Sequence, residues 1–190
     1  MFGLKVIERL LPHRPPFLMV ESVVAYQGGD APVLNAERPI RRSEPVFSGA
    51  EPPLRWPSAY IVEGLAQSSN LLSLLWALEC RFEAKGLDTG NICNALINMK
   101  PNREDYTTEL LLEFLEEGMM KPFTRIGMLA SVDVEVTGRI SVGELLRYQV
   151  KQTRVFGELS RFQVDALVGE RVIVHGIIVG ATGVHLEGTA

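Results

Sequence analysis

The sequence contains few cysteines and few histidines. Among its 190 residues there are two cysteines, Cys80 and Cys93, and three histidines. Two cysteines without a metal-ligand spacing exclude a disulfide framework and argue against a zinc site. We therefore expect no metal and no cofactor, and we expect both thiols to be reduced, as is usual in a cytoplasmic protein.

We also expect no segment of the sequence to serve as a signal peptide or a membrane span. Residues 1–14 have no long apolar core. The most apolar stretch, residues 59–78, is interrupted by Glu63, Gln67 and Asn70, which favours a buried helix over a membrane helix. A cytoplasmic location without a membrane span is the expectation.

An excess of basic residues is missing as well. Lysine and arginine number 19 against 23 acidic residues, for a net charge of −4. General binding to nucleic acid requires a basic surface that displaces counterions, so nucleic acid is not an expected partner. Hydrophobic residues make up 46% of the chain, which together with its length is typical of one globular domain.

A long helix is predicted over residues 58–84. Ser58 follows Pro57 and is the expected N-cap, and Gly86 is the expected stop. The segment is apolar on nearly all sides. A helix of this kind is covered by other structure on most of its surface, so we expect it at the centre of the fold.

Strands dominate the last third of the sequence. Polar and apolar residues alternate in 131–136, 146–151 and 161–166, which predicts antiparallel strands with one buried and one exposed face. The evenly apolar run 171–179 predicts a strand that is central or covered by a dimer partner. The other expected elements are helices over 4–11 and 105–117 and strands over 17–26, 33–38 and 92–97. An α+β fold with the sheet packed around the helix follows.

The polar residues of the long helix are the first candidates for chemistry. Glu63, Gln67 and Asn70 lie at positions i, i+4 and i+7 and share one helix face. A carboxyl group among apolar side chains has a raised pKa and can donate a proton near neutral pH. The alternative is a structural ion pair between Glu63 and an arginine such as Arg14.

The beginning of the same helix is a second candidate. The backbone N–H groups of Ser58, Ala59 and Tyr60 are expected to lack helical partners. Such groups can polarise a carbonyl oxygen, for example that of a thioester.

Two runs of the sequence resemble the β-hydroxyacyl-ACP dehydratases of the FabZ type. The run IERLLPHRPPFLMVESV (7–23) matches the pattern LPHRxPFLxV at the start of that family. The run SEPVFSGAEPPLRWPSAYIVEGLAQ (43–67) resembles its second motif, N-E-P-x-F-x-G-H-F-P followed by P-G-V-x-x-x-E-A-x-A-Q. The resemblance implies a hot-dog fold and a dimer, in one domain over 1–190 with a helical insertion at about 100–118.

The resemblance implies roles for several residues, but the family's catalytic histidine has no counterpart in this sequence. In the family a histidine after the glycine of G-H-F-P takes the α-proton, and the helix carboxylate protonates the departing hydroxyl. Glu63 matches the carboxylate, whereas Gly49 is followed by Ala50 and then Glu51. Glu51 is therefore the candidate replacement base, beside the alternative of a solvated loop carboxylate.

Other histidines are weaker candidates for the missing base. His13 belongs to the N-terminal motif, where we expect a structural or substrate-binding role. His175 is expected in the core or at an interface, and His185 lies near the C-terminus.

The resemblance also implies a substrate and partners. The substrate would be a 3-hydroxyacyl or enoyl thioester on an acyl carrier protein or on CoA, in fatty acid or polyketide biosynthesis. The expected binding residues are Ser58, Ala59, Gln67, Asn70 and His13. A basic cluster would dock the acidic carrier or its phosphate, unless it is ordinary surface charge: Arg38, Arg41, Arg42 and Arg55.

Three hypotheses for function follow. The chain is an active dehydratase-type lyase or isomerase that uses Glu63. Alternatively it is a non-catalytic acyl-binding subunit, or a heterodimer partner of a histidine-bearing paralogue. The third hypothesis is an acyl thioesterase, in which the helix carboxylate activates water.

Overall fold

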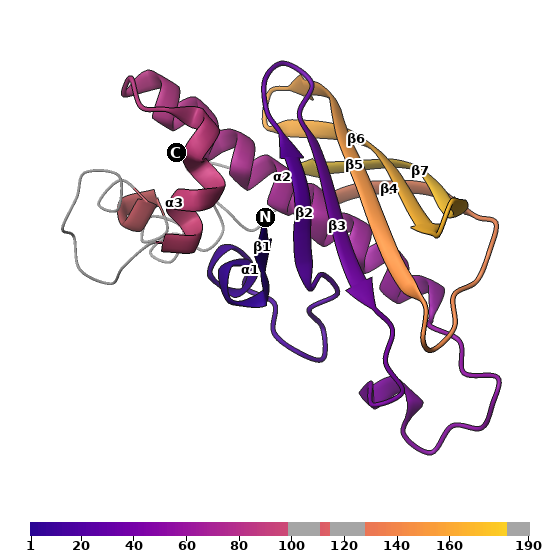
Figure 1. Cartoon of the computed structure of the whole chain (residues 1–190). Helices are drawn as coiled ribbons and strands as arrows, with labels where there is room; N and C mark the ends of the chain where they lie inside the picture. Colours follow the sequence, from indigo (N-terminus) through magenta and orange to yellow (C-terminus); the bar gives the residue numbers. More distant parts are fainter. Residues whose placement is uncertain (99–110, 115–127, 182–190) are drawn as a thin grey trace, which may run out of the picture.

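An antiparallel sheet curves around one long helix. The computed structural model describes residues 1–98, 111–114 and 128–181. The helix is α2 (Ser58–Ala84), and the sheet lies along one side of it (Figure 1). The strands are β1 (Phe2–Gly3), β2 (Ser22–Gln27), β3 (Val33–Pro39), β4 (Met128–Val136), β5 (Leu145–Phe156), β6 (Leu159–Val168) and β7 (Arg171–Ala181). This arrangement confirms the α+β class.

The strand order places β7 inside the sheet and β4 at its edge. The order is β1-β2-β3-β5-β6-β7-β4, and all neighbours are antiparallel. The prediction that residues 171–179 form a central strand is confirmed. The predicted strands at 33–38, 146–151 and 161–166 are also present, and each extends beyond its predicted bounds.

Packing against β5 fixes the position of the second turn of α2. A Cβ atom on Gly64 would lie 2.2 Å from the hydroxyl oxygen of Tyr148, which is fully buried. The same hydroxyl donates a hydrogen bond to the carbonyl of Met19 at 3.1 Å. The absence of a side chain at Gly64 therefore lets α2, β5 and the segment before β2 meet at one point, next to Glu63.

The predicted bounds of α2 are confirmed, but its N-cap is not Ser58. Pro57 occupies the N-cap position and Ser58 is the first helical residue, with no side-chain capping hydrogen bond. The φ angle of proline is fixed at about −65°, which is compatible with the start of a helix. Proline also has no backbone N–H group that would need a hydrogen-bond partner there. Pro57 therefore begins the helix without the hydroxyl cap that we expected from Ser58.

The short strand predicted at 92–97 is wrong. These residues belong to helix α3 (Ile92–Asn98), which follows the 3-10 turn η2 (Thr89–Asn91). Ile92 and Leu96 are both buried and lie one helical turn apart. A six-residue apolar run does not by itself distinguish a strand from a buried helix.

The strand predicted from residue 17 begins only at Ser22. In the intervening segment, Glu21 donates its N–H to the carbonyl of Glu37 on β3, while Leu18 and Met19 bond to side chains. The N–H of Met19 donates to Gln67 of α2, and the carbonyl of Leu18 accepts from Arg38 of β3. Helix α1 (Leu4–Leu10), which precedes this segment, confirms the helix predicted at 4–11.

Strand β4 differs from its prediction in burial. The alternation in 131–136 predicted one buried face, yet Val134 is the only residue of β4 that is even partly buried. Large apolar side chains on this strand are exposed: Met128, Leu129, Val132 and Val136. One chain alone therefore leaves the apolar residues of its edge strand uncovered.

The insertion predicted at 100–118 lies outside the described residues, apart from 111–114. The helix predicted at 105–117 likewise lies outside the described residues, apart from 111–114. Residues 111–114 are helical, with Leu111 and Phe114 buried. Within the part of the chain that the structure describes, no helix is both long and apolar enough to cross a membrane.

Candidate active site around Glu63

Glu63 projects from the second turn of α2 towards the loop that follows α1. Its Oε1 accepts a hydrogen bond from Gln67 Nε2 at 2.8 Å. The same oxygen lies 3.6 Å from Nε2 of His13. The side chain of Glu63 is 42% exposed and that of His13 is 34% exposed. A single chain therefore does not provide the apolar burial that we expected for Glu63.

The amide of Gln67 joins α2 to the loop that carries His13. Gln67 is buried, and its Nε2 also donates to the carbonyl of Phe17 at 2.7 Å. Its Oε1 accepts the N–H of Met19 at 2.8 Å. The helical spacing thus brings Glu63 and Gln67 together as predicted, and Gln67 holds both the carboxylate and the loop.

His13 is the functional candidate whose position the sequence did not reveal. Its Nδ1 is buried and has no hydrogen-bond partner among the described residues, while Nε2 faces Glu63. The only sequence signal was its place in the LPHR segment, which does not indicate the contact with α2.

The alternative pairing of Glu63 with Arg14 is wrong. The Nη1 atom of Arg14 donates instead to the carbonyl oxygens of Leu11 and His13, at 2.8 and 2.7 Å. Arg14 therefore stabilises the turn of the loop and leaves Glu63 to Gln67 and His13.

The N-terminus of α2 offers fewer free N–H groups than predicted. The N–H of Tyr60 donates to the carbonyl of Pro57 at 3.0 Å, so it is not available to a ligand. Ser58 and Ala59 are exposed, and among the described residues no backbone acceptor is found for their N–H groups. These two amides remain candidates for binding a carbonyl oxygen.

Two predicted site residues lie apart from Glu63. Asn70 lines a separate pocket with Ala66 and residues of β4, β6 and β7. Glu51 is exposed in the loop between the 3-10 turn η1 (Pro45–Phe47) and α2. No hydrogen bond or ion pair within the described chain joins Glu51 to Glu63, so one chain does not bring the candidate base to the candidate acid.

Arg38 does not belong to a surface basic cluster. It is buried, and its Nη2 forms an ion pair with Glu44 at 2.7 Å. Its guanidinium lies 5.0 Å from the ring centroid of Trp56, a cation–π distance. The prediction that Arg38 docks a carrier protein is therefore wrong, because its charge is satisfied inside the protein.

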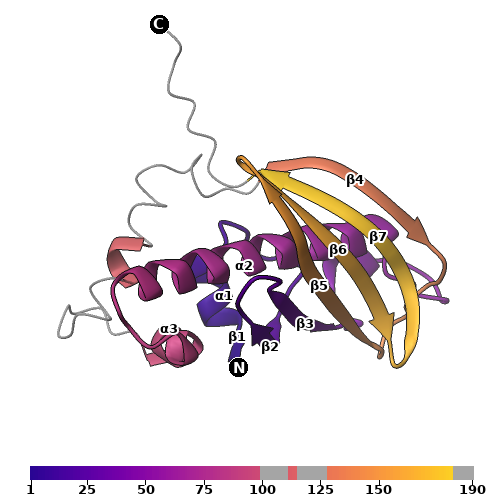
Figure 2. The ribbon, with the colours of Figure 1, turned by 90° about the horizontal axis from the view of Figure 1, so that it is seen from above.

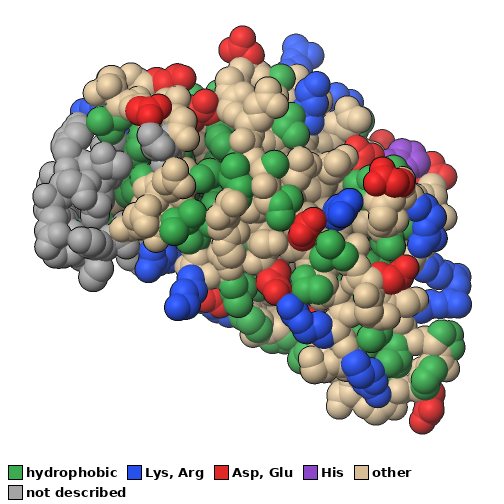
Figure 3. Space-filling view, in the orientation of Figure 1, with side chains coloured by type: hydrophobic (Ala, Val, Ile, Leu, Met, Phe, Trp, Pro, Cys, Tyr) green, Lys and Arg blue, Asp and Glu red, His purple; other side chains and the backbone are tan. Residues whose placement is uncertain are grey.

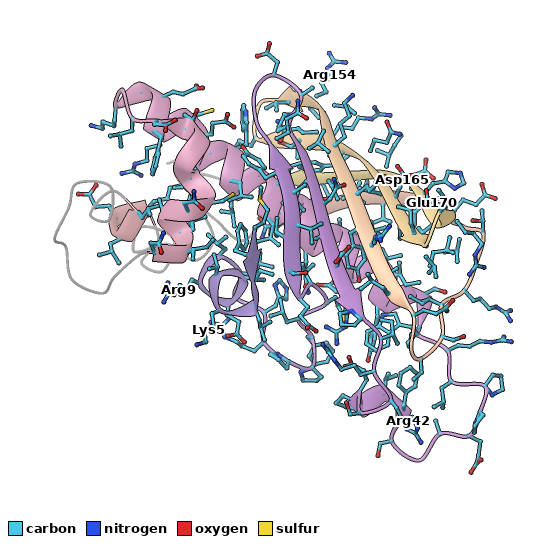
Figure 4. The ribbon with its side chains drawn as sticks, viewed as in Figure 1. Lys5, Arg9, Arg42, Arg154, Asp165 and Glu170 are labelled. Carbon is cyan, nitrogen blue, oxygen red and sulfur yellow. The ribbon has the colours of Figure 1, made fainter. Side chains whose placement is uncertain are left out.

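The other arginines of the predicted cluster are only partly free. Arg41 binds Glu21 through two hydrogen bonds, and this interaction holds the pKa of Glu21 below its usual value despite the opposing effect of burial. Arg42 donates to the carbonyl of Phe47, and Figure 4 shows it on the segment that extends away from the sheet. Arg55 is exposed. On the face seen in Figure 3, acidic and basic side chains intermix.

Of the two remaining histidines, the structure describes only His175. His175 is exposed on β7, 3.6 Å from Glu135 of β4, so it is not a core residue, and the alternative of an interface position stays a prediction. His185 lies outside the described residues. Cys80 and Cys93 are unpaired, and residues 1–98, 111–114 and 128–181 contain no cluster of three or more potential metal ligands.

Comparison with solved structures shows the fold. A subunit of the dehydratase heterocomplex ApeI:P from Xenorhabdus doucetiae has a TM-score of 0.58 at 16% identity, over 96% of this chain and 91% of that one. An uncharacterized protein from Pyrococcus horikoshii has a TM-score of 0.51 at 10% identity, over 96% and 95%. These likenesses, with the long helix and the antiparallel sheet, confirm the hot-dog fold.

Comparison with curated proteins shows the family, although no family model matches the chain. The FabZ 3-hydroxyacyl-[acyl-carrier-protein] dehydratase of a Nitratiruptor species is 40% identical over 80 residues, which cover 41% of this chain and 52% of that protein. In this and three further FabZ relatives the chain spans 44–52% of the relative's length. FabZ of Colwellia psychrerythraea is 35% identical over 121 residues, which cover 62% of this chain and 78% of that protein. The chain therefore belongs to the FabZ family of hot-dog dehydratases.

Proposed function

We propose that the chain binds 3-hydroxyacyl or enoyl thioesters and interconverts them by removal or addition of water. The observation that supports this most directly is the approach of His13 Nε2 to within 3.6 Å of Glu63 Oε1. An imidazole and a carboxyl group at that separation can act on two adjacent carbon atoms of one substrate. The FabZ relatives are named as dehydratases of such thioesters.

The reaction needs one base and one acid. The N–H groups of Ser58 and Ala59 bind the thioester carbonyl oxygen and stabilise the negative charge that develops there. His13 takes the proton from the α-carbon, and the carboxyl group of Glu63 gives its proton to the β-hydroxyl, which leaves as water. The electrons of the broken C–H bond form the new double bond. Proton return from His13 to Glu63 then restores both groups without an external reagent.

The carrier and the pathway are further parts of the proposal. An acyl carrier protein, as in the names of the FabZ relatives, or CoA would present the thioester. The pathway would be fatty acid or polyketide assembly in the cytoplasm. Among the described residues, Arg42 and Arg55 are the exposed members of the predicted basic cluster for which no acidic partner is found, and they would contact the carrier's phosphate arm.

The test is turnover by the purified chain alone. 3-Hydroxybutyryl and crotonyl thioesters are supplied, and formation or loss of the enoyl thioester is followed by its ultraviolet absorbance. Glu63→Gln keeps the hydrogen-bonding shape but cannot supply the proton, so we expect a loss of about 10²–10⁴-fold in kcat. Thiol release measured in the same tubes separates thioester hydrolysis from dehydration. A folded protein that leaves both substrates unchanged would refute catalysis by this chain alone.

The second candidate function is a subunit of a heterodimer. Its supporting observation is that Ala50 and Glu51 stand where the family has its histidine, and Glu51 does not contact Glu63 within the chain. A structural neighbour comes from a dehydratase heterocomplex, which is a precedent for such an assembly on this fold.

The heterodimer is tested by mixing the chain with a histidine-bearing FabZ subunit whose helix carboxylate has been replaced. Activity only in the mixture, and its loss with Glu63→Gln, would favour the heterodimer. If the chain alone is active, and its activity depends on both Glu63 and His13, then catalysis does not require a heterodimer.

A further inference from the structure

A second polar site lies on α2, beyond Gln67 along the helix. It is a pocket between α2 and the part of the sheet formed by β4, β6 and β7, which curve over the helix in Figure 2. The helix side of the pocket is polar, with Ser69, Asn70 and Ser73, while Phe162 and Ile178 form part of an apolar wall opposite. Its volume of about 40 Å³ corresponds to roughly three water-sized spheres, which is room for the end of a chain.

Two polar atoms of this pocket have no partner in the described structure. The hydroxyl groups of Ser68 and Ser69 donate to helix carbonyls one turn earlier, at 2.7 and 2.9 Å. Ser73, which is only 6% exposed, makes no such bond through its Oγ, and Oδ1 of Asn70 is also buried and unpaired. Buried polar groups are paired in the large majority of cases, so two unpaired atoms on residues about one helical turn apart, both lining one pocket, point to a ligand.

The pocket lies within reach of an acyl chain held at Glu63. Asn70 and Ser73 follow Glu63 by seven and ten residues, which corresponds to about 10–15 Å along the helix axis. An extended chain advances about 1.2 Å per bond, so roughly nine to thirteen bonds span this separation. The apolar wall suits methylene groups, and the polar wall suits an oxygen atom near the chain end.

We infer that the pocket selects acyl chains that carry a hydroxyl group near the end remote from the thioester. A hydroxyl is the group that fits both unpaired atoms, because it can donate to Oδ1 of Asn70 and accept from Oγ of Ser73. A terminal methyl group would leave both atoms unsatisfied. This inference rests on the proposed function and specifies its substrate class.

The experiment is calorimetric titration of the full chain with pantetheine thioesters. The 10-hydroxydecanoyl and 12-hydroxydodecanoyl esters are compared with the unsubstituted esters of the same lengths, in the Glu63→Gln protein so that turnover does not interfere. We expect roughly tenfold tighter binding of at least one hydroxylated ester, the effect of one to two added hydrogen bonds. Ser73→Ala and Asn70→Leu should each reduce this preference severalfold. Ser68→Ala is the matched control, because its hydroxyl is bonded within the helix, and it should keep the preference.

The outcomes separate the inference from the proposed function. Equal binding of hydroxylated and plain esters, or a preference that survives both Ser73→Ala and Asn70→Leu, would overturn the inference and leave the proposed function intact. Binding of neither kind of ester would overturn both. Circular dichroism melting of each variant identifies a loss of preference that comes from misfolding.

Discussion

At the scale of single residues, the geometry around Glu63 depends on one amide. Gln67 offers its two N–H donors to Glu63 and to the carbonyl of Phe17, and its oxygen accepts from Met19. Glutamate or leucine at this position would lose two or three of these bonds at once. Gln67 is therefore a positioning residue for the carboxylate, not a group that touches the reacting atoms.

Gln67→Ala tests that role. It leaves the buried N–H of Met19 and the part-buried carbonyl of Phe17 without their partner, and one unsatisfied buried group costs about 1–3 kcal/mol. We expect urea denaturation to show a loss of this size, together with a lower kcat. Gln149→Ala, at an exposed position of β5, is the control and should change neither quantity. Unchanged stability in Gln67→Ala would contradict the role of the amide.

Gly64→Ala tests the contact between α2 and β5. In an ordinary helix this change stabilises by about 0.5–1 kcal/mol. Here the new methyl group would lie 2.2 Å from the hydroxyl of Tyr148. We expect the opposite sign, a destabilisation of about 1–3 kcal/mol from overpacking, measured as the free energy of unfolding in urea. A higher melting temperature would show that the two elements are not in contact in solution.

At the scale of the elements, α2 is tied to β2 by a hydrogen bond between the Tyr26 hydroxyl and Glu79. Burial raises the pKa of Tyr26 above its usual value, and the hydrogen bond to Glu79 adds to the rise. Burial likewise raises the pKa of Tyr148 on β5. The hydrogen bonds from Tyr26 to Glu79 and from Tyr148 to the carbonyl of Met19 thus require neutral tyrosines.

Stability should consequently fall at alkaline pH. The folded state holds these two protons more tightly than the unfolded state, so the contribution is complete below about pH 10 and decreases as the pH rises above it. We expect urea denaturation between about pH 9 and 11 to show this decrease, and Tyr26→Phe to make it shallower. A pH dependence identical in the variant would exclude Tyr26 as a source.

At the scale of the whole molecule, the exposed edge strand β4 predicts an interface with a second subunit. Unpaired edge strands with exposed apolar side chains are avoided in monomers, because they pair with other chains. A partner that continues the sheet at β4 would cover Val132 and Val136 and would match the dimer expected for the family.

Val132→Lys tests the interface at β4. A charged side chain at a buried subunit contact costs several kcal/mol, so we expect the dimer to dissociate at micromolar concentration. Sedimentation velocity measures this directly. Val24→Lys, at an equally exposed apolar position of β2, is the control and should remain dimeric. A monomeric parent protein, or a dimer unaffected by Val132→Lys, would place the interface elsewhere.

Local periodicity was sufficient to predict most of the elements. The continuous apolar run predicted α2 from Ser58 to Ala84, and the alternation of polar and apolar residues predicted the strands of the last third. The two sequence motifs predicted the family and the fold, and helical spacing placed Glu63 beside Gln67. The segment at 92–97 failed because a short apolar run has no distinguishing period.

Contacts between distant segments were decided only by the tertiary structure. His13 and Glu63 meet because Gln67 and Tyr148 bond to the loop before β2, and no local pattern encodes that meeting. Arg38 resembles a surface arginine in sequence, yet folding surrounds it with Glu44 and Trp56. Short-range periodicity determines which elements form, whereas the packing of side chains far apart in the sequence determines which polar groups end up together.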